Sequence, residues 1–272
     1  MTNFPFDRIR HLLVDLDGVF YRGDAPLPGG REFIDWLRHE HIGFRMVTNN
    51  STLTPDQYVV KLGAMGIRVK ADEIFTSALA TARFLRQQNA EGNTALVIGE
   101  EGLRQALADE GIRFVDDRPD WVIVGLDKSL TYDRLTAAAL AIEAGARFLA
   151  TNADASFPIP QGLAPGTGAI LAALEATTGK RPSIVGKPRP TILELAMRSL
   201  GGTTDDTAML GDRLDTDIAA ANVLGMPSIL VFTGVSTRAE LDDTPYHPNL
   251  AIDNLTDLQD TWGAAVGAPG PD

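Results

Sequence analysis

Residues 13–24, "LVDLDGVFYRGD", place two carboxylates at the end of an apolar run, with a glycine directly after them. Residues two apart in a β-strand point the same way, so Asp15 and Asp17 share a direction or lie just past the strand's end. Carboxylates side by side repel each other, and such a pair requires a cation, a proton or an incoming electrophile. The same residues also fit a solvated turn, because Asp-Gly is a common turn sequence. The rest of the chain has to decide between chemistry and a turn.

Three more polar segments follow short apolar runs: "TNNS" (48–51), "VGKPRP" (185–190) and "LGDRLDTDIAAA" (210–221). Ligands of doubly wound sheets bind beyond the carboxyl ends of the strands, so these segments can meet "DLDG" in one crevice. Together they supply four carboxylates, one hydroxyl, two amides and one ammonium. The residues that carry these groups are Asp15, Asp17, Asp212, Asp217, Thr48, Asn49, Asn50 and Lys187.

Carboxylates without histidine or cysteine favour a hard cation such as Mg²⁺, which also takes phosphate oxygens of a substrate. A hydroxyl, a backbone amide and an ammonium suit the remaining phosphoryl oxygens. Each residue alone has a plainer interpretation. Thr48 is an ordinary residue for a strand end, Lys187 an ordinary solvated charge, and Asp217 a favourable acid at a helix start. Only their joint occurrence at strand ends indicates a site.

The elements that must position these residues are apolar runs that alternate with amphipathic stretches. A helical period covers residues 30–40, and a second helix begins after Thr54, with Pro55 at its first position and Gln57 completing a capping box. Strands are predicted at 11–16, 44–50, 95–99, 121–126, 147–151, 183–186, 208–211 and 228–232. This β-α-β alternation predicts an α/β fold with a mainly parallel sheet.

The polar strand ends gather at residues 11–51 and 183–217, whereas residues 82–182 form an alanine-rich β-α run of their own. An insertion into one core produces this distribution. We therefore expect a core built from residues 1–81 and 183–272, with a separate domain over residues 82–182.

Composition limits the classes of function. The 272 residues are 44% hydrophobic and 22% charged, as in ordinary soluble proteins. A net charge of −12 argues against nucleic-acid binding, but a local cation can still attract a small anionic substrate. There is no cysteine, which excludes thiolate chemistry. Neither a signal peptide nor a membrane span is recognised, so a cytoplasmic location is expected.

The segments "LLVDLDGVFYRGDAPLPGG", "MVTNNST", "VGKPRP" and "MLGDRLDTDIAAANVLGM" closely resemble the four signature motifs of the haloacid dehalogenase (HAD) superfamily. Their order and the long gap between the second and third are similar to subfamily IIA, the NagD-like, p-nitrophenylphosphatase branch. The resemblance implies a Rossmann-like core, an inserted α/β cap of the C2 type, and a Mg²⁺-dependent phosphatase for small phosphorylated metabolites.

The same resemblance implies roles for individual residues. Asp15 would attack phosphorus and become an aspartyl-phosphate, and Asp17 would protonate the leaving alcohol and later activate water. Thr48, Asn49 and Lys187 would bind the phosphoryl group, and Lys187 would also steady the nucleophile. Asp15, the backbone carbonyl of Asp17, and Asp212 would hold Mg²⁺. Asp217 matches a position that supports the metal from outside its ligands.

Elementary chemistry agrees with these roles. A carboxylate attacks an anionic phosphate poorly unless a metal offsets the repulsion. Like charge from Asp15 would raise the pKa of Asp17 and help it carry a proton. Residues 150–170 resemble the substrate-facing region of the cap, where Asp154 would either touch substrate or cap a turn. Gly166 and Gly168 fit a helix start better than a dinucleotide fingerprint, because the third glycine is missing.

Several alternatives remain. A phosphotransferase or mutase could use the same scaffold if a second hydroxyl competes with water. A receiver domain is rejected, because receivers are about half this length and carry the acidic pair and the phosphorylated aspartate on different strands. A P-loop kinase is rejected because proline follows Lys187. Sugar, glycerol, nucleotide and pyridoxal phosphates all stay open as substrates, as does a homodimer.

Overall fold

The computed structural model describes residues 4–88, 93–159 and 161–267, which fold as two compact units. The first, called here the core unit, comprises Met1–Val47, Val59–Ile74 and Lys187–Asp272. The second, the inserted unit, comprises Thr48–Tyr58 and Phe75–Gly186. The predicted insertion, residues 82–182, falls within the inserted unit, and the domain boundaries proposed from the sequence stay a prediction.

The core unit is built on a six-stranded sheet of order β15-β14-β13-β1-β4-β5, in which the last residue of β4 and the last two of β5 are already counted with the inserted unit. Its strands are β1 His11–Val14, β4 Gly43–Thr48, β5 Ile74–Thr76, β13 Thr207–Gly211, β14 Ser228–Val231 and β15 Leu250–Ile252. The central strand β1 pairs in parallel with β13 on one side and β4 on the other. Leu12, Leu13 and Val14 are fully buried, as expected for a parallel strand covered on both faces.

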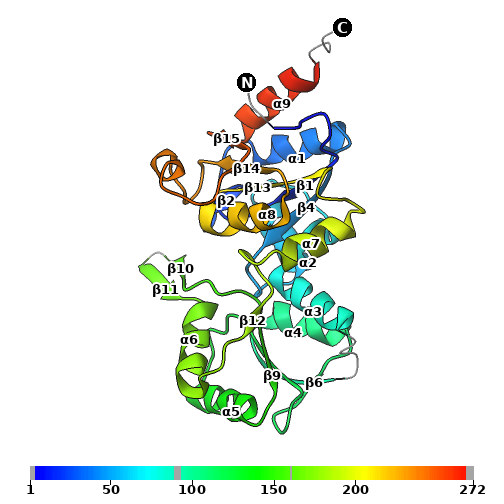
Figure 1. Cartoon of the computed structure of the whole chain (residues 1–272). Coiled ribbons are helices and arrows are strands. Elements are labelled where there is room, and N and C mark those ends of the chain that lie inside the picture. The colour runs from blue at the N-terminus through cyan, green and yellow to red at the C-terminus, as the bar shows by residue number, and fades with distance from the viewer. Residues whose placement is uncertain (1–3, 89–92, 160, 268–272) are drawn as a thin grey trace. The chain divides into compact units, whose positions relative to one another are not determined.

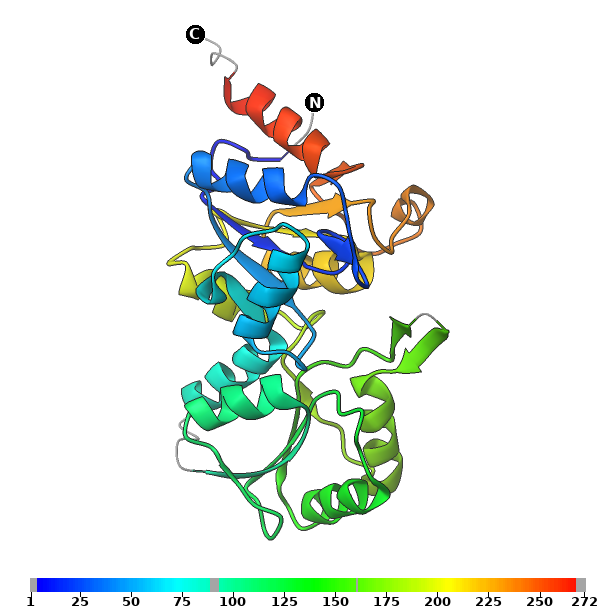
Figure 2. The ribbon, with the colours of Figure 1, turned by 180° about the vertical axis from the view of Figure 1, so that it is seen from behind.

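Helices cover both faces of this sheet. Those of the core unit are α1 Gly30–His39, α7 Thr191–Ser199, α8 Ala219–Leu224 and α9 Leu255–Gly267, with short turns η1 Ala71–Glu73, η2 Leu214–Ile218 and η3 Arg238–Leu241. In both ribbon views α1 and α9 lie on one side of the sheet, and α7 and α8 on the other (Figures 1 and 2). Trp36 of α1 packs edge-on against Trp262 of α9, with ring centroids 5.5 Å apart. A small hairpin, β2 Tyr21–Arg22 with β3 Ala25–Pro26, follows β1.

The inserted unit has its own five-stranded sheet, of order β12-β9-β8-β6-β7, in which every neighbouring pair is parallel. Its strands are β6 Thr94–Ile98, β7 Arg113–Phe114, β8 Trp121–Val124, β9 Arg147–Ala150 and β12 Ser183–Ile184. Its helices are α3 Ser77–Gln87, α4 Glu101–Asp109, α5 Tyr132–Glu143 and α6 Thr167–Thr178. An antiparallel hairpin, β10 Ser156–Ile159 with β11 Gly162–Pro165, precedes α6. Apolar side chains of β6, β8 and β9 pack against α5 and α6 in one buried cluster.

Helix α2, Pro55–Ala64, begins as predicted. The Thr54 hydroxyl accepts a hydrogen bond from the Gln57 amide at 3.2 Å, and the Gln57 side chain accepts one from the Thr54 amide at 2.9 Å. Thr54 and Gln57 therefore form the expected capping box, which satisfies two backbone donors that a helix start leaves unpaired.

The α/β fold class predicted from the sequence is confirmed, and so is the helix predicted over residues 30–40. Each predicted strand is present, although several are shorter: the run at 11–16 is a strand only to Val14, and that at 183–186 only to Ile184. Both small hairpins, β5, β7 and β15 were not predicted. Among the described residues no helix is long and apolar enough to cross a membrane.

Candidate active site

Asp15 is the first residue after β1. Its backbone amide still donates to the carbonyl of Leu210 at 2.8 Å, which continues the pairing of β1 with β13 by one residue. The side chain is buried, with only 8% of the residue exposed. The two opening acids therefore lie past the end of the strand, where the backbone is free to turn and present them.

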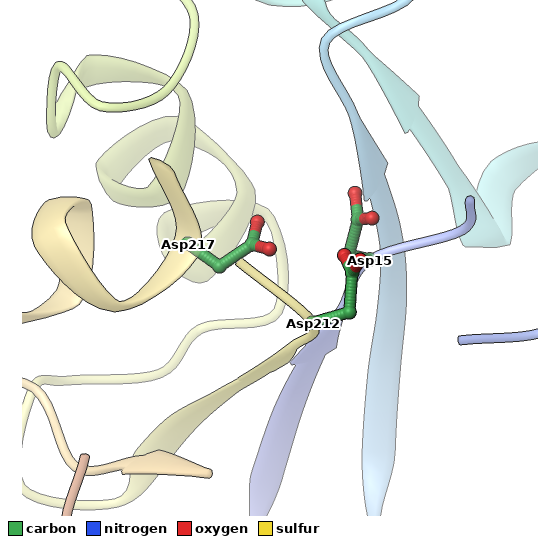
Figure 3. Close-up of side chains that lie close together, drawn as sticks. All are labelled: Asp15, Asp212 and Asp217. Atoms are coloured by element: carbon green, nitrogen blue, oxygen red, sulfur yellow. The ribbon is translucent and has the colours of Figure 1, made fainter. Parts of the chain in front are cut away.

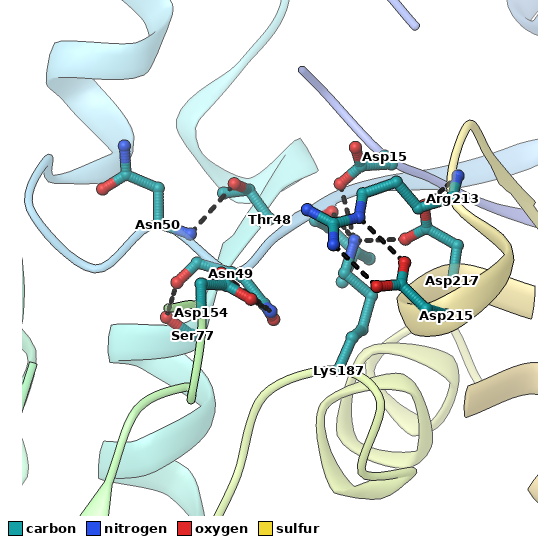
Figure 4. A network of polar contacts seen from close by, with 11 residues as sticks. Asp15, Thr48, Asn49, Asn50, Ser77, Asp154, Lys187, Arg213, Asp215 and Asp217 are labelled. Carbon is teal, nitrogen blue, oxygen red and sulfur yellow. Dashed lines mark hydrogen bonds and ion pairs between the residues drawn. The ribbon is translucent and has the colours of Figure 1, made fainter. Parts of the chain in front are cut away.

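Lys187 binds two buried acids at once. Its Nζ donates to Asp15 Oδ1 at 2.6 Å, to Asp217 Oδ1 at 2.6 Å, and to the carbonyl of Val47 at 3.2 Å. Burial of the ammonium opposes its charge, but the Asp15 and Asp217 carboxylates outweigh this cost and raise the pKa of Lys187. The lysine is therefore charged at neutral pH and holds Asp15 in a fixed position (Figure 4).

Asp212 follows β13 and is held by the loop 233–236, which follows β14. Its Oδ2 accepts a hydrogen bond from the Val235 amide at 2.7 Å, and its backbone carbonyl accepts one from the Ser236 amide at 3.1 Å. Thr233 completes this link, because its hydroxyl donates to the carbonyl of Gly18 at 2.6 Å. The loop thus ties Asp212 to the turn that carries Asp15 and Asp17.

Two glycines make this arrangement sterically possible. A Cβ added at Gly18 would lie 2.3 Å from Asp212 Oδ2, and one added at Gly234 would lie 1.8 Å from it. Gly18 also has a φ of +84°, a left-handed conformation that disfavours other residues. The Asp-Gly pair of the first motif therefore forms a turn, and its glycine leaves the space that the Asp212 carboxylate occupies.

Asp15, Asp212 and Asp217 offer carboxylate oxygens that lie within 4.8 Å of one another, and all three residues are buried (Figure 3). Asp212 Oδ1 is buried without a hydrogen-bond partner among the described residues. Both oxygens of Asp217 accept bonds, from Lys187 and from the Arg213 amide at 3.1 Å. Three buried acids share one lysine, and Asp212 Oδ1 has no hydrogen-bond donor in the described chain. This arrangement fits a hard cation that takes oxygen ligands. The assignment of Asp15 and Asp212 as its ligands, with Asp217 in support, stays a prediction.

The pKa shifts of the acids in this cluster are consistent with a cation site. Burial raises the pKa of Asp15, with added repulsion from Asp217 and Asp212. Burial, followed by repulsion from Asp217, raises the pKa of Asp212 to about 7. Charged carboxylates are thus costly here, and a divalent cation would reverse that cost.

Asp17 lies in the turn after β1, and much of its side chain is exposed. Its pKa is raised as predicted, but the cause is partial desolvation and not the expected repulsion from Asp15; the charges of Lys61 and Arg22 oppose the increase. Arg22 itself anchors the β2–β3 hairpin, because its Nε donates to the carbonyl of Thr233 at 2.7 Å. An acid with a raised pKa on a fixed turn is suited to proton transfer.

Thr48 is the last residue of β4, and Asn49 and Asn50 follow it. The Thr48 hydroxyl accepts a hydrogen bond from the Asn50 amide at 3.1 Å. The division between the units falls before Thr48, so these three residues belong to the inserted unit. The predicted contact of Thr48 and Asn49 with a phosphoryl group stays a prediction.

Asn49 and Asp154 contact each other within the inserted unit (Figure 4). Asn49 Nδ2 lies 3.2 Å and 3.3 Å from the two carboxylate oxygens of Asp154. The carbonyl of Asn49 accepts bonds from Ser77 and from Asn152, the latter at 2.9 Å. This network fixes the start of residues 150–170, the segment expected to face substrate. Contact between Asp154 and a substrate is untested.

Gly166 and Gly168 are at a helix start, as predicted: α6 begins at Thr167. A Cβ at Gly166 would lie 2.2 Å from the carbonyl oxygen of Asp154, and one at Gly168 would lie 2.6 Å from that of Ala153. The Gly168 amide donates to the Asp154 carbonyl at 2.9 Å. Both glycines let α6 begin directly against the segment that carries Asp154.

Comparison with known proteins shows the family of this chain. Residues 12–113 match the family model described as haloacid dehalogenase-like hydrolase, and residues 184–258 match a second HAD-hydrolase-like model. The 5'-nucleotidase YutF of Bacillus subtilis is 41% identical, over 90% of this chain and 95% of that protein. The chain belongs to the haloacid dehalogenase-like hydrolase family. An acid sugar phosphatase of Staphylococcus haemolyticus is also 41% identical, over 89% of this chain and 92% of its own length.

Two solved HAD structures cover nearly the whole fold. The 4-nitrophenylphosphatase of Thermotoga maritima superposes with a TM-score of 0.89 at 35% identity, over 94% of this chain and 98% of that one. NagD of Escherichia coli K-12 superposes with a TM-score of 0.87 at 34% identity, over 92% and 98%. The expected membership of the NagD-like branch is confirmed, and so is the prediction that this HAD protein is a phosphatase.

Proposed function

We propose that this HAD phosphatase hydrolyses small phosphate monoesters with Mg²⁺ as cofactor, through an aspartyl-phosphate formed on Asp15. The observation that carries the proposal is the buried cluster in which Lys187 bridges Asp15 and Asp217 while Asp212 Oδ1 is unpaired. A purely structural ion pair would not need a third buried acid with an unsatisfied oxygen.

Asp15 acts as the nucleophile. Lys187 holds one of its oxygens at 2.6 Å, which orients the carboxylate and leaves the other oxygen to attack phosphorus. The phosphorus–oxygen bond to the leaving alcohol breaks as the bond to Asp15 forms. The charge of Lys187 is close enough to stabilise the phosphoryl oxygens in the transition state. Thr48 and Asn49 bind the phosphoryl group in this proposal.

Asp17 acts as the acid and then as the base. It protonates the departing alkoxide, and the resulting carboxylate takes a proton from the water that hydrolyses the aspartyl-phosphate. Its raised pKa supports the protonated form that the first step needs.

Asp15, the backbone carbonyl of Asp17, and Asp212 are proposed to hold Mg²⁺. The bound cation supplies charge that offsets the repulsion between a carboxylate and an anionic phosphate ester. The loop 233–236 occupies Asp212 Oδ2, so that Oδ1 is presented to the metal.

The substrate class is proposed from the relatives. Their names include an acid sugar phosphatase, a 5'-nucleotidase and, at 37% identity in Corynebacterium glutamicum, a dihydroxyacetone phosphatase. These names share a small phosphorylated metabolite, and we propose that class for this chain, in a cytoplasmic setting. Phosphotransfer to a second hydroxyl is the alternative on the same scaffold, and a homodimer stays open.

Hydrolysis of p-nitrophenyl phosphate, followed by a panel of phosphate monoesters, tests the proposal. EDTA should abolish turnover and added Mg²⁺ should restore it, because three buried carboxylates need a cation. Full activity in EDTA would overturn the metal assignment. Release of free phosphate that lags behind alcohol release in the presence of glycerol would favour the phosphotransferase.

A further inference from the structure

The sheet of the inserted unit reverses its order of construction between β6 and β8. The chain runs from β6 outward to the edge strand β7, then returns to β8 on the other side of β6 and continues to β9 and β12. In open parallel sheets this reversal leaves a crevice beyond the carboxyl ends of the two strands, and ligands bind there. None of the residues around it has a role in the proposed phosphatase chemistry.

The edge strand β7 is too short to cover β6. It pairs only with Thr94 and Ala95. Further along β6, the carbonyl of Val97 is bound by two arginines instead: Arg104 Nη2 at 2.9 Å, and Arg134 Nη2 and Nε at 2.6 Å and 3.2 Å. Arg104 Nε also donates to the carbonyl of Gly99 at 2.9 Å.

This leaves two guanidinium groups sharing one neutral oxygen. Burial and then repulsion from Arg134 lower the pKa of Arg104, and the charges of Asp127 and Asp116 offset this only in part. Each guanidinium has five N–H donors, and the bonds to Val97 and Gly99 use only two of them on either arginine. No carboxylate of the described residues forms an ion pair with either arginine. The arrangement therefore favours an oxyanion from a ligand.

A cleft of about 910 Å³ opens onto the two arginines. Leu96, Phe114 and Ala137 supply apolar wall. The exposed carboxylates of Asp116 and Asp133 also line the cleft, and neither has a hydrogen bond or ion pair within the described chain.

The remaining acids of the cleft are held by neighbours. Asp127 accepts bonds from the amide and hydroxyl of Ser129, and Glu100 pairs with Lys128 at 3.9 Å. Glu101 accepts a bond from Gln57 at 2.8 Å. Asp116 and Asp133 are therefore the two carboxylates of the lining without a hydrogen bond or ion pair in the described part of the chain.

We propose that this cleft is a second binding site, for a small metabolite that carries one oxyanion group and several hydroxyl donors. The oxyanion, a carboxylate or a phosphate, binds Arg104 and Arg134, and the hydroxyls donate to Asp116 and Asp133. The two acids repel a bare anion, so they select for a ligand with donors. This site is independent of the phosphatase assignment, since its residues differ.

Two-dimensional ¹H–¹⁵N correlation NMR of the arginine Nε–H groups in the full chain tests the proposal at the site itself. D-glycerate is the carboxylate probe and inorganic phosphate the tetrahedral probe. We expect saturable shifts of the Arg104 and Arg134 signals, with a dissociation constant on the order of 1 mM for D-glycerate. The half-buried Arg45, whose Nε binds Ser199, is the reference and should not move. Absence of saturation with both probes, or an equal shift of Arg45, would overturn the site.

Two variants test the assignment of groups. Arg134→Gln should weaken D-glycerate binding at least about tenfold, read at the Arg104 signal. The double variant Asp116→Asn with Asp133→Asn removes no hydrogen bond or ion pair of the described chain, and the loss of the Asp133 charge from the first turn of α5 should lower the thermal stability by no more than about 1 kcal/mol. Removal of two negative charges should tighten binding of inorganic phosphate about tenfold. An unchanged phosphate affinity would show that these acids do not face the anion and would refute the ligand class.

Discussion

Replacement of Lys187 by methionine should destabilise the core unit, and the loss should depend on pH. The lysine is buried and lies 2.6 Å from both Asp15 and Asp217, so methionine keeps the volume but leaves buried acids without a cation. Breaking a buried ion pair from one side costs about 3–5 kcal/mol. We expect a loss of that size in the free energy of unfolding at pH 7.5 in EDTA.

The sign of the pH dependence follows from the pKa shifts. Burial already raises the pKa of Asp15 and Asp212 above the unfolded value of about 3.9, and Lys187 is one of the groups that lower both. Without Lys187 both folded-state pKa values rise further. The folded variant then binds more protons than the unfolded chain from about pH 4 to above pH 7, so its stability falls as pH rises through this range. The loss in the free energy of unfolding should be about 1 kcal/mol near pH 4, where the acids are protonated and only the packing of the methionine side chain differs. It should be greatest above pH 7.

Urea unfolding followed by tryptophan fluorescence measures this deficit. Trp36 and Trp262 report on the core unit, and a Trp121→Phe background removes the tryptophan of the inserted unit from the signal. Lys70→Met, at an exposed lysine of the core unit, is the control and should change stability by less than about 0.5 kcal/mol. A Lys187→Met deficit of equal size at pH 4.5 and pH 7.5 would refute the reasoning.

Two further changes test how the site and its neighbours are held. Gly234→Ala should weaken Mg²⁺ binding, measured by calorimetry, by about 10- to 100-fold, because the new Cβ would lie 1.8 Å from Asp212 Oδ2. Gly263→Ala, which meets nothing within 4 Å on α9, is its control, and equal affinities in the two variants would contradict the steric argument. Thr54→Ala should cost about 0.5–2 kcal/mol in thermal unfolding through loss of the capping box, and Thr54→Ser should restore most of it; no recovery would contradict capping.

The sequence indicated the acids and the lysine because their types and strand-end positions are local features. Strand ends were less predictable: β1 ends at Val14 rather than residue 16, since its length depends on how far its neighbours remain paired. The role of residues 233–236 could not be predicted, because the backbone amides of Val235 and Ser236, the Thr233 hydroxyl and the space at Gly234 act on residues that lie far away in the sequence. The only available signal was a Thr-Gly pair directly after the strand predicted at 228–232.

Contacts between segments that are distant in the sequence could not be predicted either. The pairing of Asn49 with Asp154 joins residues that lie 105 positions apart, and no spacing rule links them. The arginine pair on Val97 was missed for a similar reason, since Arg104 and Arg134 are on different helices and look like ordinary surface charges. Neither hairpin was predicted, because the two-residue strands β2 and β3 show no pattern, and the proline-containing sequences of β10 and β11 resemble a loop.

Rapid-mixing kinetics with p-nitrophenyl phosphate test the central claim, that Asp15 is the nucleophile and Asp17 the proton carrier, most directly. The p-nitrophenolate leaving group needs little protonation, so Asp17→Asn should still form the aspartyl-phosphate but lack the base that hydrolyses it. The account predicts a burst near one equivalent of p-nitrophenolate per site in Asp17→Asn, then a steady state slowed about 10²- to 10⁴-fold, and no burst in Asp15→Asn. A burst in Asp15→Asn, with no phosphoenzyme in Asp17→Asn, would contradict the assignment and exchange the two roles.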